Sequence, residues 1–345
     1  MRILQLSPLY ERVPPRGYGG TERVVAYLSD ALVRMGHDVV LFATADSQTE
    51  ATLVPCAPRA LRSDPSRPDE LAPHLLSIER AYQRAEDFDV IHSHLDHLPF
   101  PLARRCATPT VTTLHGRLDL PHLALLFDEY AEQPVVSISH SQRRPLPRAN
   151  WAGTVYHGIP EDLYDYRPNP GGYLAFVGRI AAEKRVDRAV EIAVRTGRPL
   201  RIAAKVDPSD EAYFETVRPL FRHPLVDYVG ELDDAGKNDF LGGAAALLFP
   251  IDWPEPFGLI MIEALACGTP VVAWSHGSVT EVLTHGRTGF VCDDIADAVG
   301  AVEALGHIDR GRCRADFEQR FTAARMARDY LAIYERLRAA RKDVA

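Results

Sequence analysis

Short apolar runs alternate with amphipathic stretches along most of the chain. Runs of about four to eight residues predict buried strands, and the stretches between them carry apolar residues at helical spacing. Strands that alternate with helices indicate parallel α/β sheets. Strands are expected near residues 3–6, 39–43, 52–54, 89–94, 110–115, 135–139, 154–156, 173–177, 200–205, 227–231, 244–249 and 271–273.

Helix signals fall between these strands. In the first helix, Thr21 is the expected N-cap, Val24 and Leu28 are among the apolar residues of one face, and Gly36 ends the helix. The opening of the chain therefore predicts a strand–helix–strand unit of the Rossmann type. Further helices are predicted near residues 70–85, 186–195 and 317–340.

Residues 248–274 form the most informative of these units. Three prolines interrupt the chain after Phe249, and the helix that follows ends at Gly268, where a helix C-terminus favours glycine. The segment is thus strand, loop, helix and strand. Its loop lies at the carboxyl edge of the predicted sheet, where open α/β sheets bind ligands.

Two carboxylates belong to this unit, Glu255 in the loop and Glu263 among apolar helix residues. A buried, unpaired carboxylate costs several kcal/mol, so Glu263 needs a partner. One interpretation is a hydrogen bond to a neighbouring backbone group. The other is that both carboxylates accept protons from the hydroxyls of a polyol ligand. Eight residues of helix rise span about 12 Å, the scale of a nucleotide sugar.

Composition limits the class of protein. A chain of 345 residues favours two domains, and a net charge of −8 argues against nucleic acid as the main partner. The five cysteines are widely spaced and odd in number, as in a protein of the reducing cytoplasm. The start of the chain is too quickly polar for a signal peptide, and no apolar run reaches the roughly 18 residues of a membrane helix. A cytoplasmic protein is therefore expected, with peripheral membrane association at most.

The spacing of Glu255 and Glu263, with its flanking EPFGL and EALACGTPVV, resembles the E-x7-E signature of the retaining glycosyltransferases of family 4. The resemblance implies the GT-B fold, α/β with two facing Rossmann-like domains and a C-terminal helix that crosses back to the N-terminal domain. A Pro/Gly-rich linker at 166–172 marks the expected boundary. The predicted domains are an acceptor-binding domain at 1–168, a nucleotide-sugar-binding domain at 169–320 and the helix at 321–345.

In the N-terminal half, the resemblance assigns roles at the loops after the strands. Family members reach the donor diphosphate with a loop like that of Gly19 and Gly20, and place a histidine like His115 beside the donor sugar. Without the resemblance, the loop is equally a glycine-rich turn and His115 an ordinary residue at a strand end. The spacing of His92, His94 and His97 also allows a metal site, but no carboxylate or cysteine frame surrounds it. The acceptor-side residues are expected to be Tyr18, His94, Asp96 and His140.

In the C-terminal half, Arg179 and Lys184 precede a helix whose dipole opposes cations, and a bound diphosphate would reverse that effect. The stretch resembles the family motif G-R-(I/L)-x3-K-G, with Arg185 in place of the usual glycine. By the resemblance, Glu255 orients sugar hydroxyls and Glu263 the ribose, and Lys205 contacts phosphate or lines the donor pocket unless it is only a strand end. The backbone that meets the sugar or phosphate is expected at Phe257, Gly258 and Leu259.

The resemblance predicts a hexosyltransferase that works with retention. No second carboxylate pair for a covalent glycosyl-enzyme is evident, which favours front-face attack with electrostatic stabilisation of the leaving phosphate. Two cations already face the phosphates, so no metal or cofactor is expected besides the nucleotide sugar as co-substrate. The PPRGYGGTE and DWPEPFG stretches resemble a branch of small-molecule glucosyltransferases, which favours UDP-glucose as the donor.

The sequence also allows other functions. GDP-mannose or UDP-N-acetylglucosamine are alternative donors, and the acceptor is expected to be a small molecule or a glycan. A nucleotide-sugar epimerase of the same fold would need no acceptor. A binding or scaffold protein would have no use for Arg179, Lys184, His115 and Glu255 together. A dehydrogenase is disfavoured because the G-x-G-x-x-G fingerprint of dinucleotide-binding proteins is absent.

Overall fold

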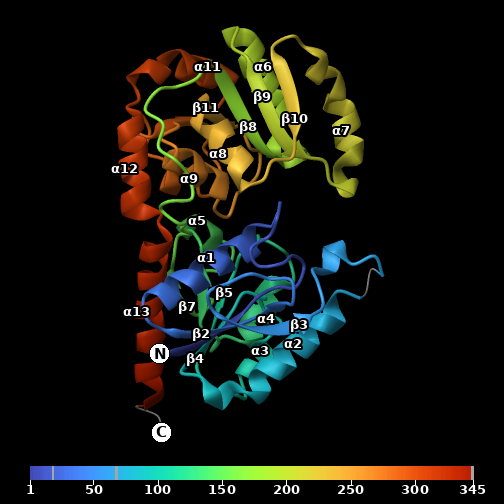
Figure 1. Cartoon of the computed structure of the whole chain (residues 1–345), viewed down its shortest axis with the longest axis vertical. Coiled ribbons are helices and arrows are strands. Elements are labelled where there is room, and N and C mark those ends of the chain that lie inside the picture. The colour runs from blue at the N-terminus through green and yellow to red at the C-terminus, as the bar shows by residue number, and fades with distance from the viewer. Residues whose placement is uncertain (18, 67–68, 343–345) are drawn as a thin grey trace. The chain divides into compact units, whose positions relative to one another are not determined.

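The chain folds into two α/β units, each built on its own parallel sheet (Figure 1). The computed structural model describes residues 1–17, 19–66 and 69–342, with side chains up to residue 340. The first unit consists of Met1–Pro160 and Ala323–Ala345, and the second consists of Glu161–Thr322. Each unit has the strand order of a Rossmann-type sheet, as the alternation of strands and helices predicted.

In the described part of the N-terminal unit, seven parallel strands follow the order β3-β2-β1-β4-β5-β6-β7. Their apolar, β-branched sequences suit a sheet that is buried on both faces, as in β5, where all four residues of TVTT are buried. The strands are β1 (Arg2–Leu6), β2 (Asp38–Thr44), β3 (Thr52–Ala57), β4 (Val90–Ser93), β5 (Thr110–Thr113), β6 (Val135–Ser137) and β7 (Trp151–Thr154).

Helices cover this sheet, and the last helix of the chain belongs to them. The helix α13 packs along α1 and buries Tyr330 and Tyr334 completely. Ile333 of the same helix contacts the backbone of β7, because a Cβ at Gly153 would lie 3.1 Å from the Ile333 side chain. The helices of the unit are α1 (Gly20–Arg34), α2 (Leu71–Gln83), α3 (Phe100–Ala103), α4 (Leu123–Glu129), α5 (His140–Arg143) and α13 (Ala323–Lys342).

The described C-terminal unit contains a six-stranded parallel sheet in the order β10-β9-β8-β11-β12-β13. All six residues of β11 are buried, in agreement with the apolar run that predicted it. The strand order reverses between β8 and β11, and this topological switch point is where doubly wound sheets bind ligands. The strands are β8 (Tyr173–Arg179), β9 (Leu200–Lys205), β10 (Val226–Gly230), β11 (Ala244–Phe249), β12 (Val271–Trp274) and β13 (Gly289–Cys292).

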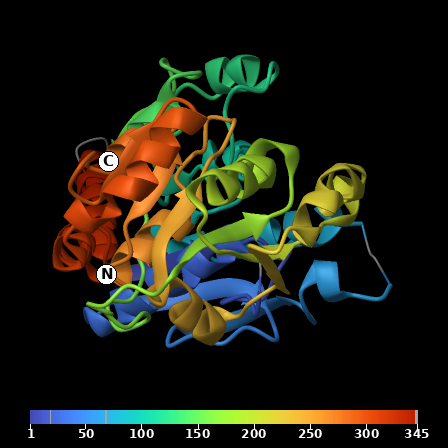
Figure 2. The same cartoon turned by 90° about the horizontal axis from the view of Figure 1, so that it is seen from above.

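The helices of the C-terminal unit connect these strands. The amphipathic α6 packs on the sheet through Val186, Ala189 and Ile192, while α7 leads to the edge strand β10 and is seen from above in Figure 2. The helices are α6 (Val186–Thr196), α7 (Glu211–Val217), α8 (Asp234–Gly242), α9 (Leu259–Ala266), α10 (Val279–Val282), α11 (Ile295–Glu303) and α12 (Arg310–Arg320).

Three predicted boundaries differ from the structure. Helix α1 begins at Gly20, so Thr21 lies inside the helix and is not its N-cap. The predicted strand at 154–156 lies earlier, as β7 at Trp151–Thr154. The predicted helix at 317–340 is two helices, because the backbone at Phe321 (φ −131°) leaves the helical region. That break coincides with the change of unit: Phe321 packs against Phe257 of the second unit, whereas Ala323 donates to Ile159 of the first.

The predicted linker at 166–172 lies within the second unit. Arg167 explains why, since its backbone N–H donates to Cys267 and its carbonyl accepts from the Arg310 guanidinium at 2.7 Å. The prolines and glycines of residues 166–172 therefore mark an irregular segment that is hydrogen-bonded to the rest of the C-terminal unit. None of the helices in the described residues is both long and apolar enough to span a membrane.

Candidate active site

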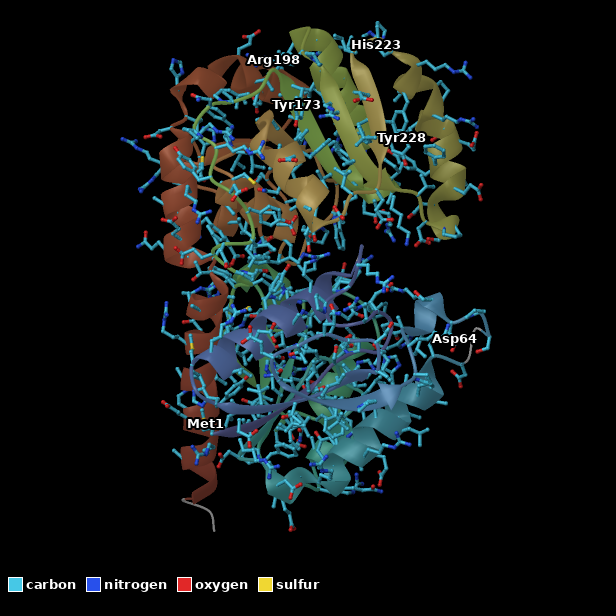
Figure 3. The ribbon with its side chains drawn as sticks, viewed as in Figure 1. Met1, Asp64, Tyr173, Arg198, His223 and Tyr228 are labelled. Carbon is cyan, nitrogen blue, oxygen red and sulfur yellow. The ribbon has the colours of Figure 1, made fainter. Side chains whose placement is uncertain are left out.

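The carboxyl ends of β8, β9 and β11 carry the predicted cations Arg179, Lys184 and Lys205 and the predicted carboxylate Glu255, or lead directly to them. Arg179 ends β8, and Lys205 ends the neighbouring strand β9 in direct register with it. The proline-rich loop leaves the end of β11 beside them. Arg198 and His223, labelled in Figure 3, come just before β9 and β10 and mark the opposite end of the sheet.

The loop after β11 holds a close ion pair. The Lys184 ammonium group contacts the Glu255 carboxylate, and the Trp253 indole N–H donates to the same carboxylate oxygen at 3.0 Å. The ammonium nitrogen also lies 4.8 Å from the centre of the Trp253 ring, within reach of a cation–π interaction. Both charged side chains keep partial exposure, 19% for Lys184 and 12% for Glu255. They are therefore ordered by the protein and still accessible to a ligand.

Two glycines give this loop its path. Gly258 precedes α9 with φ +79°, which favours glycine, and a Cβ there would lie 2.9 Å from Met261. Gly277 has φ +60°, and a Cβ there would lie 2.3 Å from the Glu255 carbonyl oxygen. The next residue, Ser278, donates through its backbone to Glu255 and through its hydroxyl to Phe257. The segment after β12 thus clamps the loop that carries Glu255.

The segment after β8 orders the other predicted cations. The Arg179 guanidinium donates to Glu183 at 2.6 Å and lies 3.0 Å from Asp210. Arg185 adopts the left-handed conformation (φ 54°, ψ 52°) that explains why a glycine is usual at this position. The Arg185 side chain forms one ion pair with Asp187, in the first turn of α6, and another with Asp252, in the loop after β11.

Glu263 is buried in α9, as its apolar surroundings predicted, but its partner is neither a backbone group nor solvent. Both carboxylate oxygens accept from Lys237 at 3.0 Å. Lys237 comes from α8. It is one of only four lysines in the chain, at positions 184, 205, 237 and 342, but no local pattern links it to Glu263. The Phe257 side chain is also buried, so only the backbone of this residue is available at the loop. Leu259 is the first residue of α9 and is half-buried.

In the N-terminal unit, the strand ends assemble a cluster of imidazole rings. His94 Nδ1 lies 2.9 Å from His115 Nε2, and the His115 ring stacks on His157 with 5.3 Å between ring centres. The His92 and His94 rings lie side by side, with 4.1 Å between their centres. Burial lowers the pKa of His115 to about 3 and holds the pKa values of the other three well below the usual range. All four rings are therefore neutral at neutral pH.

These neutral rings do not form a metal site. His92 is hydrogen-bonded on both nitrogens, to Tyr334 and Thr113, each at 2.7 Å. No group of three or more His, Cys, Asp or Glu side chains in the described part of the chain is arranged to hold a metal ion. The spacing of the histidines reflects a hydrogen-bonded core.

The remaining N-terminal candidates lie in different environments. Gly19 immediately precedes α1 and Gly20 opens it, so both belong to the amino end of a helix, where backbone N–H groups lack helical partners. Asp96 (φ 48°) is exposed, and its carboxyl group accepts the backbone N–H of His115. His140 is exposed at the start of α5. Tyr18 lies outside the described residues.

Sequence reasoning missed several side chains that complete these groups. Lys237 donates to Glu263, and Trp253 donates to Glu255. Gln5 accepts from His94 and donates to Tyr334. Glu22 directly follows the glycine loop, where the resemblance already places it toward the acceptor side. Its carboxylate accepts the backbone N–H of Glu11, and burial raises its pKa to about 7. An isolated Trp or Gln has no sequence signature, so only the fold reveals these contacts.

Two family models match adjacent parts of the chain. The model described as Glycosyltransferase Family 4 matches residues 18–158, and the model described as Glycosyl transferases group 1 matches residues 167–311. The first range contains β2 to β7, and the second contains all six strands of the C-terminal sheet.

Similar proteins span most of the chain. D-inositol 3-phosphate glycosyltransferase of Kribbella flavida is 30% identical, over 88% of this chain and 86% of that protein. Glycogen synthase of Mycobacterium tuberculosis (strain CDC 1551 / Oshkosh) is 27% identical, over 96% of this chain and 95% of that protein. Among solved structures, AviGT4 of avilamycin A biosynthesis has a TM-score of 0.76 at 23% identity, over 98% of each chain. Anabaena Alr3699/HepE in complex with UDP-glucose has a TM-score of 0.71 at 17% identity, over 98% of this chain and 100% of that chain.

Proposed function

Because the chain belongs to family 4 of the glycosyltransferases and is a hexosyltransferase with the GT-B fold, we propose that it transfers glucose from UDP-glucose to a hydroxyl group of a small-molecule acceptor, with retention at the anomeric carbon. The Lys184–Glu255 pair at the carboxyl ends of β8 and β11 carries the proposal, because it combines a phosphate-binding cation with a carboxylate that can accept sugar hydroxyls.

The proposed reaction is a front-face displacement. The acceptor oxygen bonds to the anomeric carbon as the bond from that carbon to the β-phosphate oxygen breaks, and the acceptor proton passes to the leaving phosphate. Arg179 and Lys184 stabilise the negative charge that develops on the phosphate, and the Gly19–Gly20 amides add N–H donors. Lys205 assists from the end of β9. With this charge compensation, the reaction needs no metal and no cofactor besides the nucleotide sugar.

The other candidate residues position the substrates. Glu255 orients hydroxyls of the glucose, Glu263 orients the ribose, and the backbone at Phe257, Gly258 and Leu259 meets the sugar or the phosphate. His115 contacts the glucose. Tyr18, Asp96 and His140 contribute to acceptor binding, while His94 acts through its hydrogen bond to His115.

The proposed donor and compartment rest on separate observations. UDP-glucose is supported by the DWPEPFG loop and by the structural similarity to a protein solved with UDP-glucose. A small-molecule acceptor is in keeping with relatives such as D-inositol 3-phosphate glycosyltransferase. All five cysteines lie in the described residues and are free thiols, which supports a cytoplasmic location.

A donor screen tests the proposal. Purified protein is tested with UDP-glucose, UDP-N-acetylglucosamine, GDP-mannose and ADP-glucose, with and without EDTA, for thermal stabilisation and for release of the nucleotide. UDP-glucose should stabilise the protein and be slowly hydrolysed in EDTA, and Arg179→Ala should lose both effects. Arg198→Ala, at the opposite end of the sheet, should keep them. Stabilisation by no nucleotide sugar would contradict the proposal, and epimerised donor would indicate an epimerase instead.

A further inference from the structure

Gln5 and His94 connect the core of the N-terminal unit to His115. Gln5 lies on β1 with no exposed surface, and His94 is 2% exposed at the end of β4. The His94 Nε2 atom lies 2.9 Å from Gln5 Oε1, and its Nδ1 atom lies 2.9 Å from His115 Nε2. Both ring nitrogens of His94 are used in these contacts, and the Gln5 amide is used in the contact with His94 and in one with Tyr334. An effect of Gln5 or His94 on a substrate therefore passes through His115.

The direction of these hydrogen bonds follows from Tyr334, on the other side of Gln5. Its hydroxyl lies 2.7 Å from His92 Nδ1 and 3.3 Å from Gln5 Nε2. A hydroxyl donor usually lies about 2.7–2.8 Å from its acceptor, so the one proton of Tyr334 belongs to the short contact with His92. The Gln5 amide nitrogen therefore donates to Tyr334, and the Gln5 amide oxygen faces His94.

This orientation determines the tautomers of both histidines. A neutral imidazole carries one N–H, and that of His94 must lie on Nε2 to meet the Gln5 oxygen. His94 Nδ1 is then an acceptor, so His115 donates to it from Nε2. The remaining nitrogen of His115, Nδ1, carries a lone pair. Within the described residues, no hydrogen bond to that atom is present.

The His115 ring is also held in place from other sides. His157 stacks on it with an angle of 19° between the rings, and the Asp96 carboxyl group accepts its backbone N–H. Burial lowers the pKa of His115 to about 3, so protonation does not exchange the roles of the two nitrogens at neutral pH. The orientation of the ring and the position of its proton are thus both set by the protein.

Resting on the proposed function, in which His115 contacts the sugar, we infer that Gln5 and His94 are positioning residues that hold His115 as the Nε2–H tautomer, so that Nδ1 accepts a hydrogen bond from a hydroxyl group of the hexose. A hydroxyl can donate to this nitrogen, but a carbonyl or ether oxygen at the same place cannot. The two hydrogen bonds that run from Gln5 through His94 to His115 form a relay. This relay therefore helps to select sugars that carry a free hydroxyl at that position.

Nitrogen NMR of the full-length protein tests the tautomer without any substrate. In protein labelled with 15N-histidine, long-range 1H–15N spectra distinguish a protonated from an unprotonated ring nitrogen, and His115→Gln assigns the signals. Wild-type His115 should be protonated on Nε2. Gln5→Leu should shift part of the population to Nδ1–H, while Gln133→Leu, at a buried glutamine elsewhere in the unit, should not. Protonation of Nδ1 in the wild type would overturn the inference.

A second pair of variants keeps the test decisive if Gln5→Leu does not fold. His94→Asn keeps an oxygen acceptor for His115 Nε2–H and should retain the tautomer, whereas His94→Leu should lose it. Equal tautomer populations in these two variants would contradict the relay.

Kinetics then separate this inference from the proposed function. Gln5→Leu should lower kcat for UDP-glucose roughly 3- to 10-fold, the effect of one hydrogen bond, with KM changed less than twofold. Normal turnover with wild-type His115 protonated on Nδ1 would overturn the inference alone. An Nε2–H tautomer with no turnover of any nucleotide sugar would support the relay and overturn the proposed function.

Discussion

At the scale of single residues, the Lys237–Glu263 pair shows how a charge is kept inside an apolar helix. The Glu263 side chain is 4% exposed and that of Lys237 is 11% exposed, and Asp234 lies 3.0 Å from the same ammonium group. A buried ion pair adds little net stability, but losing one partner leaves the other charge buried and uncompensated. The pair therefore makes the position of α9 depend on α8.

Lys237→Met is expected to lower the free energy of unfolding by about 3–5 kcal/mol, measured by urea denaturation, because the Glu263 carboxylate loses its partner. The double variant Lys237→Met/Glu263→Leu should recover a large part of that loss. Arg195→Met, which removes an exposed ion pair with Glu191, should cost less than about 1 kcal/mol. Additive losses in the double variant would show that the pair is not coupled.

Trp253→Phe is expected to reduce kcat/KM for the nucleotide sugar roughly 3- to 10-fold, since the Glu255 carboxylate loses the indole donor and keeps Lys184. Steady-state kinetics measure the change. Trp151→Phe is the matched control, because its indole N–H donates to Leu146 in the N-terminal unit and should not affect turnover. An unchanged kcat/KM in Trp253→Phe would remove this tryptophan from the site.

Single residues could be predicted from the sequence only where a motif surrounds them. Glu255, Lys184 and Arg179 follow from local patterns, and the structure places them at one sheet edge. Gln5 and Tyr334 are 329 positions apart, and no local pattern links them. Contacts of this kind depend on the whole fold, so a prediction from the sequence does not include them.

At the scale of elements, strand positions were predictable because buried strands are short apolar runs with β-branched residues. The ends of helices were less predictable than the positions of strands. The break between α12 and α13 follows from where Phe321 and Ala323 pack rather than from a proline or glycine. The prolines predict a loop from Pro250 to Gly258, but the path of this loop depends on a second segment, which follows β12 and packs against it.

Gly277→Ala tests that dependence. The added Cβ would lie 2.3 Å from the Glu255 carbonyl oxygen, so the loop must move, and affinity for UDP should fall at least tenfold by calorimetry. Gly286→Ala is the control, because it also has a positive φ (+74°) but no atom within 4 Å of the new Cβ. It should lose only about 1–2 kcal/mol of stability and keep its affinity. Equal affinities in both variants would contradict the clamp.

At the scale of the whole molecule, the neutral histidine cluster makes the N-terminal unit sensitive to acid. A histidine whose pKa is lowered in the folded state binds its proton only on unfolding, so stability is complete above the unfolded pKa of about 6.5 and falls as the pH drops below it. Each of the four contributes up to about 1.4 kcal/mol per pH unit. Glu22 and Asp96 oppose this trend, because burial raises the pKa of both carboxyl groups, that of Glu22 to about 7, and so favours the folded state at lower pH.

The unfolding free energy of the N-terminal unit is therefore expected to decrease between pH 6.5 and pH 4.5, because four histidines outweigh two carboxyl groups. Urea denaturation followed at several pH values measures the slope. The double variant His92→Gln/His94→Gln is measured over the same pH range, and each unfolding free energy is compared with that of the variant at pH 7. The variant should lose less stability per pH unit than the wild type. A pH-independent wild type would contradict the lowered pKa values.

The division of the chain makes the N-terminal unit depend on the last helix. Met326, Tyr330, Ile333 and Tyr334 of α13 are buried, and each contributes about 1.5–3 kcal/mol by burial. Their combined contribution is comparable to the entire stability of a typical domain, about 5–15 kcal/mol. Residues 1–160 alone would also leave His92 and Gln5 without their Tyr334 partner.

A fragment of residues 1–160 is accordingly expected not to fold by itself, whereas residues 161–322 should fold alone, because the core of that unit lies within its own segment. Addition of a peptide of residues 323–345 should restore a cooperative thermal transition to the first fragment, observed by circular dichroism. The same peptide with Tyr334→Ala should restore it poorly, since a buried ring and two hydrogen bonds are lost. A cooperative transition of residues 1–160 without peptide, at the temperature of the full chain, would mean that α13 is attached to the unit without stabilising it.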